Sequence, residues 1–152
     1  MNKVNESKKL GISDYFNLYK KLKEGKKLND GKSIKIAILS SFTVNGIKEA
    51  LSVKCNELGV NAEFYIGGYN QYAQEILGKN SSLYKFDPDL IILFIDTNSI
   101  LGNDYLNPYD TDDSKRKKFI ENKLKEIKSL IEKIKSSSRA KILLHNFEIP
   151  NF

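Results

Sequence analysis

Three short polar segments stand out because each directly follows a run rich in apolar residues. They are residues 40–43 (SSFT), 67–70 (GGYN) and 96–99 (DTNS). Together they offer hydroxyl groups, an amide, a carboxylate and glycine N–H groups, which can polarise or bind a carbonyl group. The inventory suits a serine nucleophile with an oxyanion hole, or a site for a small polar ligand.

The segments that precede these polar groups are typical of buried β-strands, because they are short and rich in isoleucine and leucine. We expect strands at residues 34–39, 61–66, 89–95 and 140–144. Apolar side chains recur at helical spacing between them. We therefore expect helices at residues 46–58, 71–77 and 119–135.

This alternation predicts an α/β fold of three layers, with helices on both faces of a parallel sheet. We expect the flavodoxin-like strand order 2-1-3-4, in which ligands bind at the carboxyl ends of the first and third strands. Residues 40–43 and 96–99 should meet there. The chain ends at Phe152, soon after the fourth strand, so we expect a fragment that lacks the final strand of such folds and leaves an exposed edge.

Residues 1–33 lie outside this pattern. Residues 1–10 are polar and rich in lysine, Ser13 is a possible helix N-cap, and Gly25 ends the apolar periodicity. We divide the chain into an N-terminal arm, helix and linker (1–33) and an α/β domain (34–152). We expect the leading helix to pack on the sheet.

Ser41 is the candidate nucleophile, and Asn98 and Gly68 are the candidate oxyanion donors. A nucleophilic serine needs a base about 3 Å from its hydroxyl oxygen. The only candidate for this base in the sequence is His145, which ends the fourth expected strand, whereas Ser41 follows the first. Alternatively, Ser41 binds a ligand or caps the next turn, Asn98 bonds its own backbone, and the glycine forms a plain turn.

Seven further residues are candidate ligand contacts because they lie at the same strand ends. They are Ser40, Gly67, Tyr69, Asn70, Asp96, Thr97 and His145. Alternatively, Tyr69 simply packs at the rim of the core. His145 could likewise be a histidine at a strand end whose ring is hydrogen-bonded within the fold.

Composition excludes several classes of protein. The 152 residues are 40% hydrophobic and 29% charged, which fits one domain with a core. No apolar run approaches the roughly 18 residues of a membrane span, and residues 1–10 lack the apolar segment of a secretory signal. We expect a cytoplasmic protein that binds no membrane. Cys55 alone makes no internal disulfide or zinc site, and we expect no metal and no cofactor.

The net charge of +6 comes from 25 basic residues, of which only Arg116 and Arg139 are arginine. Phosphate recognition favours arginine. We therefore expect a solvated, lysine-rich surface and no nucleic-acid binding. Residues 115–118 (KRKK) could contact an acidic carrier protein or another domain.

Residues 40–43 after a strand resemble block I of the SGNH (GDSL-type) hydrolases, Gly-Asp-Ser-hydrophobic-Thr, with Ser41 at the nucleophile. Residues 87–90 (DPDL) and 96–99 resemble block III, with Asn98 at the oxyanion-hole asparagine. The glycine pair lies where block II supplies an N–H. The Asp-x-x-His block, which supplies the base, is absent.

A narrower resemblance covers most of the chain. The segments 36–43 (IAILSSFT), 65–77 (YIGGYNQYAQEIL), 81–89 (SSLYKFDPD) and 144–150 (LHNFEIP) are similar to the N-terminal domain of FkbH-like proteins. This resemblance implies an SGNH-like domain that precedes a HAD-type phosphatase domain in the same polypeptide. It also implies a link to glyceryl-carrier-protein thioesters and to polyketide or other secondary metabolism. The Asp-x-Asp-x-Thr motif of the HAD domain is not in this sequence.

Three functions remain open. The first is a catalytically degenerate SGNH-like domain that handles an acyl or glyceryl thioester on an acyl carrier protein, or docks to a C-terminal HAD domain. The second is an active serine esterase or acyltransferase whose base lies outside the chain. The third is a structural domain that forms homo-oligomers through the fourth strand.

Overall fold

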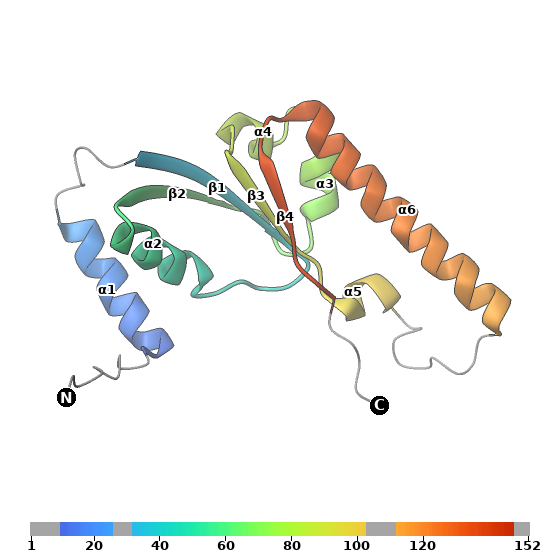
Figure 1. The fold of residues 1–152 in the computed structure, drawn as a ribbon, viewed down its shortest axis with the longest axis horizontal. Coiled ribbons are helices and arrows are strands. Elements are labelled where there is room, and N and C mark those ends of the chain that lie inside the picture. Colours follow the sequence, from blue (N-terminus) through green and yellow to red (C-terminus); the bar gives the residue numbers. More distant parts are fainter. Residues whose placement is uncertain (1–9, 26–31, 103–111, 148–152) are drawn as a thin grey trace, which may run out of the picture. The chain divides into compact units, whose positions relative to one another are not determined.

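The computed structural model describes residues 10–25, 32–102 and 112–147 (Figure 1). Within these ranges, helices and strands alternate along the chain. In order they are α1 (Ile12–Glu24), β1 (Lys32–Ser40), α2 (Ile47–Glu57), β2 (Val60–Ile66), α3 (Tyr72–Leu77), α4 (Ser82–Phe86), β3 (Leu90–Phe94), α5 (Thr97–Leu101), α6 (Asp113–Ser137) and β4 (Lys141–Leu144).

The strands form one sheet in the order β2-β1-β3-β4, in which β1 and β4 each run parallel to β3. The predicted α/β class and strand order are therefore confirmed. Ser40 at the end of β1 lies opposite Phe94 at the end of β3. This register brings residues 40–43 and 96–99 to the same edge of the sheet.

A cluster of buried hydrophobic residues lies on one face of the sheet. Leu39, Ile91 and Leu93 are fully buried there, at alternate positions along their strands. They pack with Ile76 of α3, Leu83 of α4, and Leu130 and Ile134 of α6. Full burial of each such side chain contributes about 1.5–3 kcal/mol, so this layer fixes the strand ends that carry the polar segments.

Contacts within the chain divide it into two units, one of residues 1–33 and 44–62 and one of residues 34–43 and 63–152. In the first unit, α1 packs against α2. Gly46 has a φ of +84°, and a Cβ there would lie 2.9 Å from Ile12 Cδ1. Only glycine suits this close approach. All the predicted site residues belong to the second unit.

Two helices begin earlier than the sequence suggested. The N-cap of α1 is Gly11, whose N–H donates to Asp14 Oδ2 at 2.9 Å, and not Ser13. The long helix α6 begins at Asp113, because the preceding Asp112 accepts the Lys115 N–H at 3.0 Å. The short helices α4 and α5 had not been expected. Across the described ranges, no helix combines the length and apolarity that crossing a membrane requires.

Candidate functional site

Ser41 ties the end of β1 to the end of β3. Its N–H donates to the carbonyl of Phe94 at 2.9 Å, which continues the pairing of the two strands. Its Oγ accepts the N–H of Asp96 at 2.9 Å and donates to Asp96 Oδ2. The residue is only 2% exposed. The hydroxyl is therefore turned into the protein and engaged as both donor and acceptor.

Asp96 is held by more than this serine. Its Oδ1 accepts the N–H of Ser99 at 3.0 Å, which caps α5, and its Oδ2 accepts the Ser99 hydroxyl at 2.6 Å. Burial raises the pKa of Asp96, but the hydrogen bonds from Ser41 and Ser99 outweigh burial and hold its pKa below the ordinary value. The carboxylate is thus ionised at neutral pH and well supplied with donors.

This arrangement opposes nucleophilic catalysis by Ser41. Asp96 is the acceptor of its hydroxyl proton, and a carboxylate with a lowered pKa is a weak general base. The arrangement suits a fixed joint between two strand ends.

Several polar groups next to Ser41 already form hydrogen bonds within the fold. The hydroxyl of Ser40 donates to the carbonyl of Phe42 at 2.6 Å, and the carbonyl of Ser40 accepts the N–H of Asn70 at 3.2 Å. The N–H of Gly67 donates to the carbonyl of Ile38 at 2.9 Å. Among the described residues, the N–H of Gly68 makes no hydrogen bond, so it is the glycine donor available to a ligand.

The glycine at position 67 is required by packing. A Cβ there would lie 2.7 Å from Leu39 Cδ2, so a larger residue would have to displace this fully buried side chain. Asn70 has a φ of +52°, a left-handed conformation that asparagine tolerates well. This turn carries Tyr69, which is 71% exposed and turned to solvent.

On α5, Thr97 is buried while Asn98 is exposed. The Asn98 carbonyl accepts the N–H of Gly102 at the end of the helix. Its side-chain amide makes no hydrogen bond within the described part of the chain, so it can reach a ligand.

His145 follows β4 and joins an aromatic group. Its N–H donates to the carbonyl of Leu93 at 3.2 Å. Its ring lies 5.3 Å from that of Phe94, which in turn lies 6.2 Å from the ring of Phe42. Its Nδ1 is buried and, among the described residues, has no hydrogen-bond partner. The residue that accepts the Ser41 proton is Asp96, so the described structure does not pair His145 with Ser41.

Sequence reasoning missed Ser99, Phe42 and Phe94 as members of this cluster. Ser99 has a readable signal, because an aspartate three residues before a serine is the spacing of a helix cap. The two phenylalanines lie inside the polar segment and inside the apolar run, and nothing in those patterns distinguishes a ring beside His145 from ordinary core.

Two other findings concern places where a ligand could bind. The described residues contain no group of three or more histidine, cysteine or acidic side chains placed to hold a metal ion. An open hollow of about 500 Å³ is lined by Asp87 and by residues 135–139, which precede β3 and β4. It therefore adjoins the amino ends of these strands and contains none of the predicted site residues.

Comparison with known protein families matches residues 35–151 to the family described as FkbH, N-terminal domain. The chain belongs to this family. No curated protein matches the sequence. Its SGNH-like character rests on the motifs in the sequence and stays a hypothesis.

Among solved structures, the chain is similar to the N-terminal part of the protein BF1531 from Bacteroides fragilis, which contains a phosphatase domain and is complexed with Mg. The TM-score is 0.70 at 21% identity, and the match covers 90% of this chain and 34% of that one. The chain therefore spans about a third of its neighbour, and at this identity the likeness shows a shared fold.

Proposed function

We propose that this FkbH-family N-terminal domain is a non-hydrolytic module that handles an acyl or glyceryl thioester on a carrier protein, beside a phosphatase domain of the HAD type. The thioester would be bound and presented without being cleaved by this domain. This places the domain among binding modules and leaves the chemistry to its neighbour.

The observation that carries this proposal is the engagement of Ser41. A serine hydrolase needs a serine that is open to its substrate and linked to a base. Here the serine is 2% exposed, and its hydroxyl donates to a carboxylate whose pKa is lowered.

Binding remains possible because at least two donors at this edge of the sheet make no hydrogen bond to the described residues. They are the exposed side-chain amide of Asn98 and the N–H of Gly68, which follows β2. A thioester carbonyl accepts such donors. The phosphatase domain present in the Bacteroides fragilis neighbour supports the pairing with a HAD-type domain.

An active serine esterase or acyltransferase is the second candidate, because the Ser41 hydroxyl does donate to an ionised carboxylate. In that case Asp96 would accept the proton during attack. The lowered pKa of Asp96 disfavours this role.

Incubation of the full chain with a glyceryl-loaded holo acyl carrier protein separates these functions. We expect saturable binding without release of the carrier thiol above its background rate. The Asn98→Ala variant should bind about 3- to 10-fold more weakly, because one hydrogen bond is lost. The Asn80→Ala variant removes another exposed amide, between α3 and α4, and should bind as the wild type does.

Thiol release that disappears in the Ser41→Ala variant would establish the esterase and overturn the proposal. Failure of the wild-type chain to bind the carrier would overturn its role in thioester handling. Equal weakening by Asn98→Ala and Asn80→Ala would remove Asn98 from the site.

A further inference from the structure

We propose that the part of α6 that precedes its first buried residue, Leu130, is a docking surface for an acidic protein domain. The identity of this partner, an acidic carrier protein, rests on the proposed function. The inference adds the place on the chain where such a partner binds. The surface, called here the α6 stripe, consists of Lys117, Ile120, Leu124 and Lys128.

The first argument is the contrast between the two halves of α6. The helix spans 25 residues, but its buried residues are Leu130 and Ile134, both in the carboxyl-terminal half. These two residues pack into the core cluster on the sheet. No residue between 113 and 127 is buried. Figure 1 shows this part of the helix extending past the strands of its own unit.

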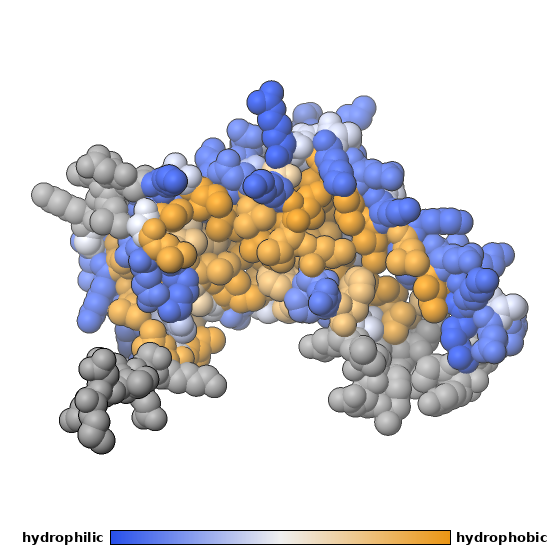
Figure 2. Space-filling view, in the orientation of Figure 1, coloured by the Kyte–Doolittle hydropathy of each residue, from blue (hydrophilic) through white to orange (hydrophobic). Residues whose placement is uncertain are grey.

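The second argument is the exposure of apolar residues on that half. Ile120 is 50% exposed and Leu124 is 57% exposed. Four residues apart, they lie next to each other on one face of the helix. Figure 2 shows hydrophobic residues along one side of α6 and hydrophilic residues along the other. Covering the pair would remove apolar surface from water and favour association.

The third argument is charge. The sequence of α6 contains nine lysines and arginines and four acidic residues, a net charge of +5 against +6 for the whole chain. Lys117 precedes Ile120 by three residues and Lys128 follows Leu124 by four, so the two lysines flank the apolar pair on the same face. A complementary partner presents carboxylates on either side of an apolar contact.

The two flanking lysines are among the lysines of α6 that remain available to a partner. Lys115, Arg116 and Lys123 form ion pairs within three residues along the helix. Their partners are Asp112, Asp113 and Glu126. Among the described residues, neither Lys117 nor Lys128 has a carboxylate within ion-pair distance. Their charges are thus directed to solvent and, on docking, to the partner.

Other occupants fit less well. A second copy would bring two helices of net charge +5 together, which is repulsive. Nucleic acid would meet an apolar pair at the centre of the surface and a helix whose one arginine, Arg116, is already paired with Asp113. A bilayer would gain little from two exposed aliphatic side chains, because interfacial helices bury a longer apolar face.

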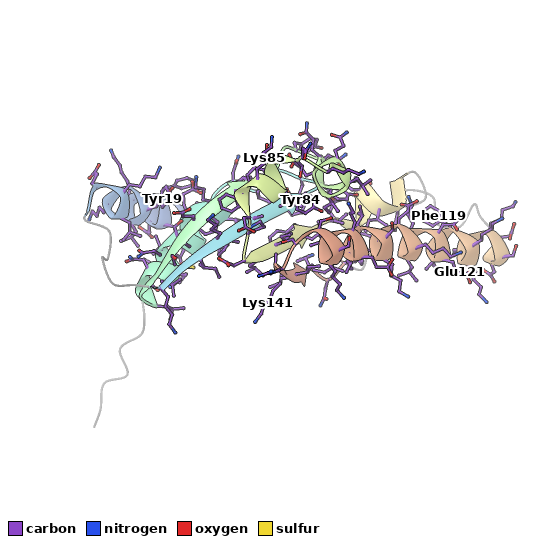
Figure 3. The ribbon with its side chains drawn as sticks, turned by 90° about the horizontal axis from the view of Figure 1, so that it is seen from above. Tyr19, Tyr84, Lys85, Phe119, Glu121 and Lys141 are labelled. Atoms are coloured by element: carbon purple, nitrogen blue, oxygen red, sulfur yellow. The ribbon has the colours of Figure 1, made fainter. Side chains whose placement is uncertain are left out.

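The part of α6 without fully buried residues is nevertheless pre-organised. Asp112 caps the helix, since its Oδ1 accepts the Lys115 N–H at 3.0 Å and the Ser114 hydroxyl at 2.7 Å. Figure 3 shows Phe119 and Glu121 extending from α6 in different directions. Phe119 also carries the Lys123 ammonium 5.7 Å from the centre of its ring. A helix formed in advance loses less entropy on binding.

The test measures the affinity of the full chain for a holo acyl carrier protein, in variants with reversed charge. The Lys117→Glu/Lys128→Glu variant changes the stripe. The Lys118→Glu/Lys125→Glu variant makes the same change in net charge on another face of the same helix. We expect the stripe variant to lose at least tenfold in affinity and the control to stay within about threefold. The Leu124→Ser variant should also weaken binding, without any change in charge.

Each outcome has a distinct meaning. Wild-type binding that all the variants retain would overturn the stripe and leave the proposed function intact. Equal losses in both charge variants would show attraction by net charge alone and would also overturn it. Absence of binding by the wild type would overturn the carrier-handling function and the stripe together. Binding of anionic lipid vesicles that depends on the stripe, with no binding to the carrier, would assign the surface to a membrane instead. Unchanged helix content by circular dichroism confirms that the variants are folded.

Discussion

The hydroxyl of Ser41 accepts the N–H of Asp96 and donates to its carboxylate, while the backbone of Ser41 continues the pairing of β1 with β3. These hydrogen bonds stabilise the fold, whatever chemistry the residue takes part in. A buried N–H that loses its partner costs about 1–3 kcal/mol. At the scale of single residues, a loss of stability of this size is what a structural role of Ser41 predicts.

We therefore expect Ser41→Ala to lower the free energy of unfolding by about 1–3 kcal/mol, because the N–H of Asp96 loses its acceptor. Ser99→Ala removes an exposed hydroxyl that also donates to Asp96, and should cost less than about 1 kcal/mol. Urea unfolding measures both. A Ser41→Ala variant as stable as the wild type would contradict the assignment of Ser41 to the strand joint.

The sequence predicted that Ser41 and Asp96 lie together, because each follows one of two adjacent parallel strands. It did not predict that Ser41 is closed off. Whether a hydroxyl faces solvent or the protein depends on its rotamer and on the length of the strand. The spacing of residues in the sequence gives neither of these. The exposure of Asn98 beside the buried Thr97 has the same origin, since both lie on a helix that was not foreseen.

At the scale of elements, the strands were predictable because their apolar runs are bounded by turn residues. The helices α4 and α5 were not, because five residues are too few to show a helical period. The start of α6 was missed because its first turns are almost entirely polar. The cap at Asp112 was the readable signal there.

The cap of α5 gives a prediction about pH. Burial raises the pKa of Asp96, but hydrogen bonds from Ser41 and Ser99 hold it below the ordinary value of 3.8. A carboxylate whose pKa is lowered by folding stabilises the fold above the ordinary value, and this stabilisation is lost as the pH falls through the lowered pKa. The Asp96→Asn variant keeps an acceptor for the cap and loses the charge.

We therefore expect the wild type to exceed Asp96→Asn in unfolding free energy most clearly above about pH 5. The difference should shrink steadily as the pH falls below the ordinary aspartate value. Urea unfolding of both proteins across the acid range measures it. A difference that stays constant with pH would mean that the charge of Asp96 does not stabilise the fold.

At the scale of the whole molecule, the candidate site and most of the net positive charge lie on different elements. The polar site lies at the carboxyl ends of the strands, whereas nearly all the net charge lies on α6. The sequence interpretation treated most of the lysines as a solvated surface and offered residues 115–118 as a contact for an acidic carrier protein or another domain. It could not identify the α6 stripe, because the exposure of Ile120 and Leu124 depends on how far the helix extends past the sheet that it packs on.

The central claim is that Ser41 is a joint between strands and not a nucleophile. It is tested most directly by incubating the full chain with a fluorophosphonate probe and measuring the intact mass, with Ser41→Ala as the control. We expect no adduct in either protein, because the hydroxyl is buried and its proton is held by a carboxylate of lowered pKa. An adduct on the wild type that is lost in Ser41→Ala would show an activated serine and would contradict the account.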